Sequence, residues 1–181
     1  MGPGQAAPRP SWTVTSGQQA PEVVDRLLSS LPGWFGIASS NAAYVEAART
    51  LPTYLAWPAA APGGTAARSG EQPAGVLLAE RHFPGAAEIH LLAVQPDLHR
   101  RGAGRALVEA LERDLAADGV RWLQVKTLGP SLPDEGYERT RRFYLGIGFE
   151  PLQEITGLWP ENPCLIMVKT LALCGAGPLP M

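Results

Sequence analysis

Residues 88–106 read EIHLLAVQPDLHRRGAGRA, and this stretch decides the fold. Its apolar first half is typical of a strand, and its glycine-rich end opens an amphipathic helix predicted over about 101–117. The first turn of a helix leaves backbone N–H groups without partners and carries the positive end of the helix dipole. Glycines keep side chains away from those donors. The segment therefore predicts an anion site suited to a pyrophosphate.

Two known phosphate-binding fingerprints do not match this turn. The dinucleotide pattern GxGxxG fails because Leu107 stands where the third glycine is needed, and the sequence has no GxxxxGK[ST] segment. A nucleotide-binding oxidoreductase would also need a regular parallel sheet and an acidic residue for the ribose, so this class is disfavoured. The pattern that does match is Arg-x-x-Gly-x-Ala, formed by Arg101, Gly104 and Ala106.

This pattern and the segments around it resemble the GNAT superfamily of N-acetyltransferases. The strand HLLAV precedes the turn, the strand RWLQVKT follows the helix, and RFYLGIGF at 142–149 is similar to the family's Phe-Tyr-x-x-x-Gly-Phe segment. The resemblance covers residues 75–170 well and the N-terminal third loosely. It implies an α/β fold: a mixed, mostly antiparallel central sheet with a V-shaped splay between the fourth and fifth strands, and helices on both faces.

Local sequence patterns place the other elements around this centre. Helices are expected over 21–28, 41–50 and 137–146, and strands over 11–16, 54–57, 75–81, 121–127, 150–155 and 165–171. Residues 58–73 are small and polar, which indicates a surface loop within a hairpin connection. We expect a flexible N-terminal segment over 1–10, a single GNAT domain over 11–171 and a C-terminal tail over 172–181.

Composition disfavours several classes of protein. A chain of 181 residues with 45% hydrophobic and 18% charged residues suits one globular domain. A net charge of -2 gives no electrostatic case for nucleic acid or an anionic membrane as partner. No apolar run is long enough to span a bilayer, and the N-terminus lacks the apolar core of a secretory signal. Cys164 and Cys174 form no disulfide or metal motif, so we predict no metal and a reducing, cytoplasmic location.

The resemblance implies acetyl-coenzyme A as cosubstrate and the residues that hold it. The strand backbone of Leu92, Ala93 and Val94 is expected to pair with the acetyl carbonyl and the pantetheine arm. The pyrophosphate is expected on the backbone amides from 101 to 106, with arginines supplying positive charge. The residues predicted to bind the cofactor in this turn are Arg100, Arg101, Gly102, Ala103, Gly104, Arg105 and Ala106.

Acetyl transfer to an amine needs a neutral nucleophile, a stabilised oxyanion and a proton for the departing thiolate. By resemblance, Tyr144 is the predicted general acid and also contacts the cofactor, with Tyr137 on the same helix as the alternative. Glu88 is the leading candidate for general base, because it begins the strand at the offset where some relatives carry a catalytic glutamate. His90, on the same face of the strand, and a chain of waters are the alternatives.

The sequence therefore predicts an acetyl-coenzyme A-dependent N-acetyltransferase that acetylates a primary amine directly, in a ternary complex. The acceptor, a small-molecule or peptide amine, is left open. The alternative is a non-catalytic sensor or regulatory module that binds acyl-coenzyme A with a similar fold. Relatives are often dimers, so a homodimer is compatible with the resemblance. Aromatic residues of the N-terminal half fit core packing, although this half walls the acceptor site in the family: Trp34, Phe35, Tyr44, Tyr54 and Trp57.

Overall fold

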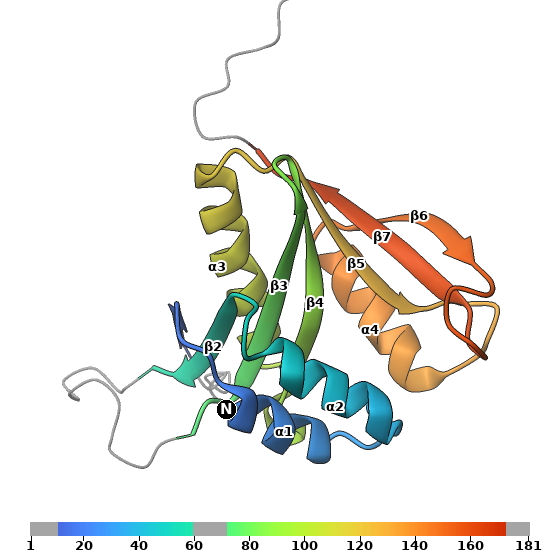
Figure 1. Ribbon diagram of the computed structural model, residues 1–181, viewed down its shortest axis with the longest axis horizontal. Coiled ribbons are helices and arrows are strands. Elements are labelled where there is room, and N and C mark those ends of the chain that lie inside the picture. Colours follow the sequence, from blue (N-terminus) through green and yellow to red (C-terminus); the bar gives the residue numbers. More distant parts are fainter. Residues whose placement is uncertain (1–10, 60–71, 173–181) are drawn as a thin grey trace, which may run out of the picture.

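The computed structural model describes residues 11–59 and 72–172. Its elements in chain order are β1 (Trp12–Ser16), α1 (Pro21–Ser29), α2 (Ala38–Ala47), β2 (Thr53–Pro58), β3 (Gly75–Phe83), β4 (Ala86–Val94), the 3-10 helix η1 (Pro96–Leu98), α3 (Ala103–Ala117), β5 (Trp122–Leu128), α4 (Glu135–Gly146), β6 (Glu150–Ile155) and β7 (Cys164–Thr170) (Figure 1). The N-terminal segment, most of the loop predicted at 58–73, and the tail after Ala172 lie outside the described residues.

The seven strands form one mixed sheet in the order β1-β2-β3-β4-β5-β7-β6. Every neighbouring pair is antiparallel except β4 and β5, which are parallel. Their pairing covers only residues 86–89 against 122–125, and beyond it the two strands diverge, as Figure 1 shows. The predicted fold, a mostly antiparallel sheet splayed between the fourth and fifth strands, is confirmed.

A β-bulge at His90 accompanies this divergence. Ile89 of β4 pairs with Ala79 of β3, and the next pair along is Leu91 with Leu78, so His90 has no residue opposite it. An extra residue in one strand bends that strand and increases its twist. Because His90 directly follows the last residue of β4 that pairs with β5, the bend directs the second half of β4 away from β5.

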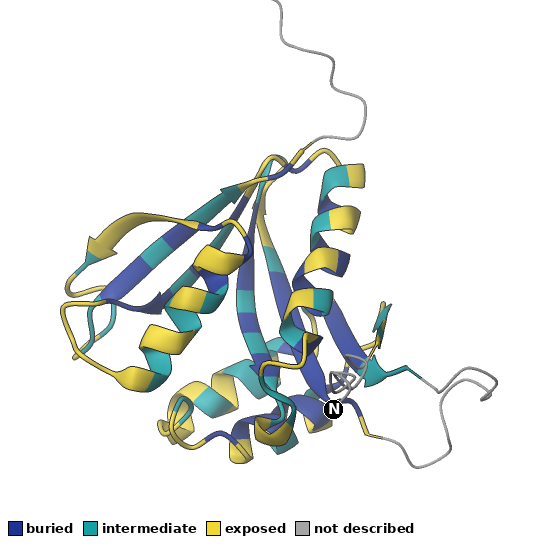
Figure 2. Ribbon diagram, turned by 180° about the vertical axis from the view of Figure 1, so that it is seen from behind, coloured by how far each residue is buried: buried dark blue, intermediate teal, exposed yellow. Residues whose placement is uncertain are grey.

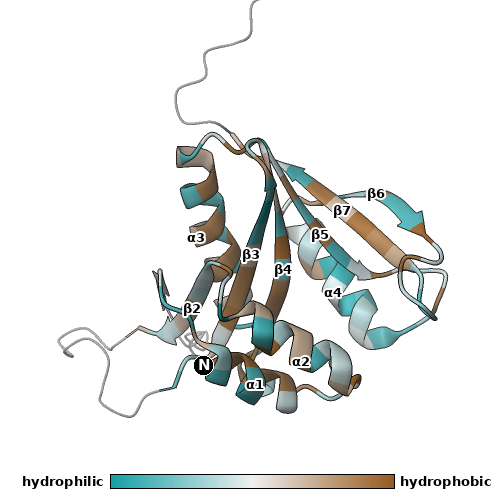
Figure 3. Ribbon diagram, in the orientation of Figure 1, coloured by the Kyte–Doolittle hydropathy of each residue, from teal (hydrophilic) through white to brown (hydrophobic). Residues whose placement is uncertain are grey.

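Helices cover both faces of the sheet and hold β4 between two apolar clusters. On one face, leucines of α3 and aromatic residues around α4 share a cluster with Ile89. On the other face, Leu27 and Leu28 of α1 pack with Leu91, and α2 adds partly buried residues. Figure 2 shows buried positions along the central strands, and Figure 3 shows apolar residues where α1 and α2 cover β3 and β4. Burying one such leucine stabilises the fold by about 2 kcal/mol, so β4 is firmly placed.

Several predicted helix boundaries differ from the structure, by one or two residues in α1, α3 and α4 and by three in α2. The helix predicted from Arg101 begins at Ala103, because Gly102 before it has a left-handed backbone. The helix predicted over 41–50 lies at Ala38–Ala47. The sequence of α2 carries no apolar stripe that would mark where the helix starts, and accordingly no residue of α2 is fully buried.

Candidate active site

The turn between η1 and α3 presents backbone donors without partners. The first intrahelical hydrogen bond of α3 runs from the N–H of Ala106 to the carbonyl of Gly102, at 3.0 Å. The amides of Ala103, Gly104 and Arg105 precede this bond and donate to no backbone group of the described chain, and no side chain caps the helix. Among the predicted donors, these three amides at the start of α3 are therefore free in the described chain, whereas the amide of Ala106 is engaged within the helix.

The backbone of the turn is shaped by two residues in the left-handed region. Arg100 has φ 62° and Gly102 has φ 96°; a side chain at Gly102 would be strained. At Gly104, a Cβ atom would lie 3.3 Å from the ring of Phe143 in α4. Glycine at this position therefore lets α4 approach the turn while the amides stay uncovered.

Charged side chains around the turn divide into two groups. Arg105 is engaged: its Nη2 donates to the carbonyl of Gly146 at 3.1 Å, and its Nη1 lies 3.8 Å from Glu109. Arg100 and Arg101 have exposed side chains. Positive charge for a bound anion is therefore available chiefly from Arg100 and Arg101, next to the free amides and the helix dipole.

Trp12 of strand β1, distant in sequence, forms a hydrogen bond with the turn. Nε1 of Trp12 in β1 donates to the carbonyl of Arg101 at 2.8 Å, and a Cβ atom at Gly102 would lie 3.6 Å from the same Nε1. Sequence analysis did not identify Trp12 as a site residue. Its strand contains no local signal for a turn 89 residues away, so only the fold discloses this contact.

Beyond the bulge, one backbone edge of β4 faces the gap between β4 and β5. Backbone groups alternate between the two edges of a strand. The N–H of Gln95 donates to the carbonyl of Ala74 on the β3 side, at 2.8 Å. By alternation, the backbone of Ala93 also faces β3, whereas that of Leu92 and Val94 faces the gap. Of the three predicted backbone contacts, this geometry favours Leu92 and Val94.

Trp34, in the segment after α1, contacts both His99 and helix α4 near this edge. His99 donates from Nε2 to the carbonyl of Val94 at 2.7 Å, and its ring packs edge-on against Trp34, with centroids 5.6 Å apart. Trp34 also donates from Nε1 to the hydroxyl of Thr140 at 3.3 Å, and its carbonyl accepts from the Tyr137 hydroxyl at 2.9 Å. The segment after α1 therefore reaches α4, and Tyr137, the alternative acid, is already engaged there.

Tyr144 lies on the buried side of α4. It is 4% exposed, and its ring packs edge-on against Phe143 and Phe149, with centroids 5.1 and 5.3 Å away. Its hydroxyl forms no hydrogen bond with any described residue. Burial, and to a lesser degree Tyr44, raises the pKa of Tyr144. A phenol carries its proton at neutral pH in any case, as a general acid must, and burial holds that proton more tightly.

A second hydroxyl near the gap was not identified from the sequence. Oγ1 of Thr127 in β5 is buried and has no hydrogen-bond partner among the described residues. It lies beyond Val125, the last residue of β5 that pairs with β4, and on the same face as Leu123 and Val125. Leaving a buried hydroxyl unpaired costs about 1–3 kcal/mol.

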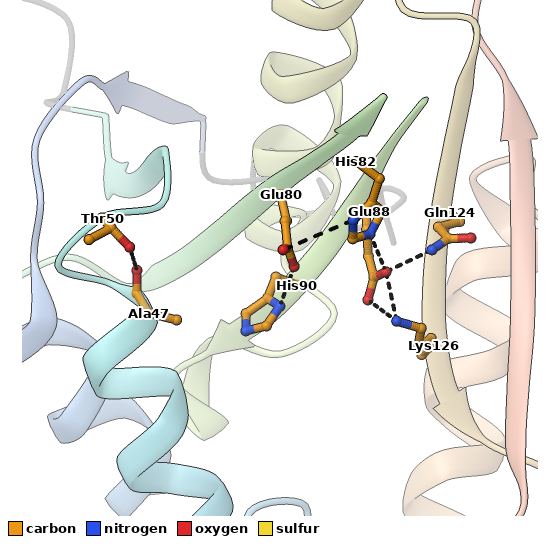
Figure 4. A network of polar contacts seen from close by, with 8 residues as sticks. All are labelled: Ala47, Thr50, Glu80, His82, Glu88, His90, Gln124 and Lys126. Atoms are coloured by element: carbon orange, nitrogen blue, oxygen red, sulfur yellow. Dashed lines mark hydrogen bonds and ion pairs between the residues drawn. The ribbon is translucent and has the colours of Figure 1, made fainter. Parts of the chain in front are cut away.

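Glu88 lies at the centre of a polar network on the opposite face of the sheet from α3 (Figure 4). Its carboxylate accepts from Lys126 at 2.8 and 3.0 Å, from Gln124 at 2.7 Å and from His82 at 2.9 Å. Burial alone would raise the pKa of Glu88, but the hydrogen bonds from Lys126, His82 and Gln124 outweigh burial and lower it. A carboxylate held in this way takes up a proton less readily than a free one.

The network continues through Glu80 of β3 to His90. Oε2 of Glu80 lies 3.3 Å from Nδ1 of His90, and its Oε1 lies 4.0 Å from Nδ1 of His82. The ring of His90 packs edge-on against Tyr44 of α2, with centroids 5.5 Å apart. The two predicted base candidates, Glu88 and His90, therefore lie in one cluster but have different partners.

Further findings concern metal sites, membrane-spanning helices and the two cysteines. No group of three or more His, Cys, Asp or Glu residues within 11–59 and 72–172 is arranged to hold a metal ion. No helix in these ranges combines the length and apolar character needed to cross a membrane. Cys164 is buried as a free thiol, and Cys174 lies outside the described residues.

Solved acetyltransferase structures share this fold. A protein described as an acetyltransferase of the GNAT family from Desulfovibrio desulfuricans superposes with a TM-score of 0.72 at 19% identity, over 90% of this chain and 100% of that one. The ribosomal-protein-S18-alanine N-acetyltransferase of Escherichia coli gives 0.67 at 16% identity, over 93% and 99%. An aminoglycoside 6'-N-acetyltransferase complexed with coenzyme A gives 0.64 at 18%, over 91% and 99%.

The sequence itself also matches this class. The sequence model of the Acetyltransferase (GNAT) family matches residues 31–149, more than half of the chain. The chain belongs to the GNAT acetyltransferase family, and the resemblance inferred from the phosphate turn is confirmed. A search of curated proteins found no match to it.

Proposed function

We propose that this chain is an N-acetyltransferase that uses acetyl-coenzyme A and acetylates a primary amine directly, in a ternary complex. The observation that carries the proposal is the set of free amide donors at the start of α3, next to the unpaired edge of β4. Membership of the GNAT acetyltransferase family supports it. The functional unit is taken as residues 11–171, as the sequence predicts.

The residues present fit coenzyme A. The amides of Ala103, Gly104 and Arg105 would hold the pyrophosphate, with Arg100 and Arg101 neutralising its charge. Glycine at 104 keeps those amides uncovered. Further along the gap, the backbone of residue 92 and the N–H of residue 94 would pair with the polar groups of the pantetheine arm. Bound acetyl-coenzyme A supplies the acetyl group as a reactive thioester.

The chain's own groups would then serve the transfer. The N–H of Leu92 faces the gap and would donate to the developing oxyanion, which one well-placed donor stabilises by about 3 kcal/mol. Tyr144 holds a proton for the departing thiolate. A lysine-like amine must first lose its proton, which costs about 4 kcal/mol at neutral pH. Glu88 and His90 lie on the face of the sheet opposite α3 and are the candidates for the group that accepts this proton.

Thiol release from acetyl-coenzyme A, measured against a panel of amines, tests the proposal. The panel should contain small monoamines, polyamines, amino acids and short peptides. We expect at least one amine to accelerate thiol release, together with an acetylated product of the corresponding mass. Calorimetric binding of coenzyme A without acceleration by any amine would instead identify an acyl-coenzyme A sensor. Absence of coenzyme A binding would contradict both functions.

A further inference from the structure

We propose that His90 accepts the proton of the acceptor amine and that Glu80 is the residue that positions it. This inference rests on the proposed function, since it names the proton acceptor of the same reaction. As the N–C bond of the amide forms and the C–S bond of the thioester breaks, the amine proton passes to Nε2 of His90. The thiolate sulfur takes the hydroxyl proton of Tyr144, and both side chains then recover their starting states by exchange with solvent.

The bulge in β4 places His90 next to the gap. His90 directly follows the last residue that pairs with β5, and it is the extra residue that has no partner in β3. Bulges commonly redirect a side chain beside an active site. The His90 side chain is 29% exposed, whereas the Glu88 side chain is 6% exposed. An acceptor amine can therefore reach the imidazole, while the carboxylate of Glu88 is enclosed.

The contact with Glu80 sets which ring nitrogen of His90 is free. A neutral imidazole carries one N–H, and the group that faces one nitrogen determines where that hydrogen sits. Oε2 of Glu80, 3.3 Å from Nδ1, favours a hydrogen on Nδ1 and leaves the lone pair on Nε2. Neither ring nitrogen forms a hydrogen bond with a described residue, so the Glu80 carboxylate acts on Nδ1 through its charge and proximity, and Nε2 faces no carboxylate at ion-pair distance. A base oriented by a carboxylate through its other nitrogen is the logic of nucleophile-activating triads.

The other groups around His90 do not replace Glu80 in this role. Tyr44 of α2 packs edge-on against the imidazole and limits its rotation; burial raises the pKa of Tyr44, so it stays neutral. Glu88 is occupied by its own donors, Lys126 of β5 foremost. The titratable and charged groups that face this cluster are Tyr44, Glu80, His82, Glu88 and Lys126.

Nitrogen-15 NMR of the imidazole rings tests the positioning step without any acceptor. In the parent protein near pH 8, we expect His90 to carry its hydrogen on Nδ1. Glu80→Ala should convert it largely to the Nε2–H form, and Glu80→Gln, which keeps an acceptor oxygen, should fall between the two. Glu150→Ala removes an exposed carboxylate of β6 and should leave the His90 signals unchanged. An Nε2–H form in the parent protein would overturn the proposal.

Kinetics with an amine found in the panel test the proton transfer. His90→Ala should lower kcat about 100-fold, within the usual range for a general base, with KM for acetyl-coenzyme A unchanged and partial rescue by added imidazole. Glu80→Ala should lower kcat about tenfold in the parent but have no further effect in His90→Ala. If Glu88→Gln is the variant that loses about 100-fold while His90→Ala stays near the parent, the proposal is wrong. A parent protein inactive with every amine would instead refute the proposed function, whatever the NMR result.

Discussion

The indole N–H of Trp12 donates a 2.8 Å hydrogen bond to the backbone carbonyl of Arg101. The donor belongs to the edge strand β1, and the acceptor belongs to the turn that presents the free amides. The bond satisfies the carbonyl of Arg101 and uses none of the turn's N–H groups, which stay available to a ligand. The first strand of the sheet thus takes part in shaping the anion site.

Replacing Trp12 by phenylalanine should weaken coenzyme A binding. An aromatic ring is kept, but the indole N–H and part of the ring's packing are lost, and the missing hydrogen bond to Arg101 alone corresponds to about 1 kcal/mol or about fivefold in affinity. Calorimetry with coenzyme A measures the change. Trp57→Phe is the matched control, because Nε1 of Trp57 donates to Thr15 at 3.0 Å within the same strand pair and away from the turn. Equal losses in both variants would contradict a specific role for Trp12.

Gly104→Leu should abolish coenzyme A binding while the fold persists. A Cβ atom here already lies 3.3 Å from Phe143, so a larger side chain must push against α4 or cover the amides of Ala103 and Arg105. Calorimetry reports binding, and far-ultraviolet circular dichroism reports the fold. Gly146→Leu is the control, since a Cβ atom at this helical glycine meets no atom within 4 Å. Unchanged affinity in Gly104→Leu would argue against the phosphate-binding turn.

Tyr144→Phe should lower kcat at least tenfold while the affinity for coenzyme A and the stability change little. The hydroxyl has no hydrogen-bond partner among the described residues, so its removal breaks no intramolecular contact. Tyr54→Phe is the matched comparison and should lower stability instead of kcat, because the Tyr54 hydroxyl donates to Asp114 at 2.8 Å. Loss of that bond should cost about 1 kcal/mol of unfolding free energy with kcat unaffected. Steady-state kinetics and urea unfolding separate the two effects.

Glu88 should make the fold sensitive to acid. Its pKa is lowered in the native state, so its ionised form contributes stability fully above the pKa of an unfolded glutamate, near 4.5. That contribution is lost as the pH falls from there through the lower native value. The unfolding free energy of the parent should therefore exceed that of Glu88→Gln by a constant amount near neutral pH and by progressively less below about pH 4.5.

Urea unfolding of both proteins between pH 3.5 and pH 7 measures this difference. Glu150→Gln alters an exposed carboxylate on β6 and should show no such trend. A difference between the parent and Glu88→Gln that stays constant across the whole range would mean that the network of Lys126, His82 and Gln124 does not hold Glu88 in its ionised form.

Local features of the chain were predictable from the sequence, because their cause lies within a few residues. The glycines of the turn, the leucine stripe of α3 and the alternation of Leu123 and Val125 with Gln124 and Lys126 all follow from short-range periodicity. These features, with the segment around Tyr144, were enough to identify the fold and the family.

Features that depend on pairing between strands were not predictable in the same way. The bulge at His90 exists only relative to β3, and the contact between Glu80 and His90 depends on that pairing. Likewise, the backbone N–H and C=O of Ala93 face β3 because of the pairing with that strand, and the residue type of Ala93 does not reveal this. The lack of a hydrogen-bond partner for the buried hydroxyl of Thr127 also depends on tertiary packing, since β5 no longer pairs with β4 at this residue.

The short parallel pairing, residues 86–89 with 122–125, is the only ladder that joins the two halves of the described sheet. Past it, a molecule lying in the gap would act as a substitute strand and tie both halves together. Loading with coenzyme A should therefore stiffen the protein as a whole, with slower amide hydrogen exchange on both β4 and β5. The concentration of coenzyme A would then govern the rigidity of the protein as well as its activity.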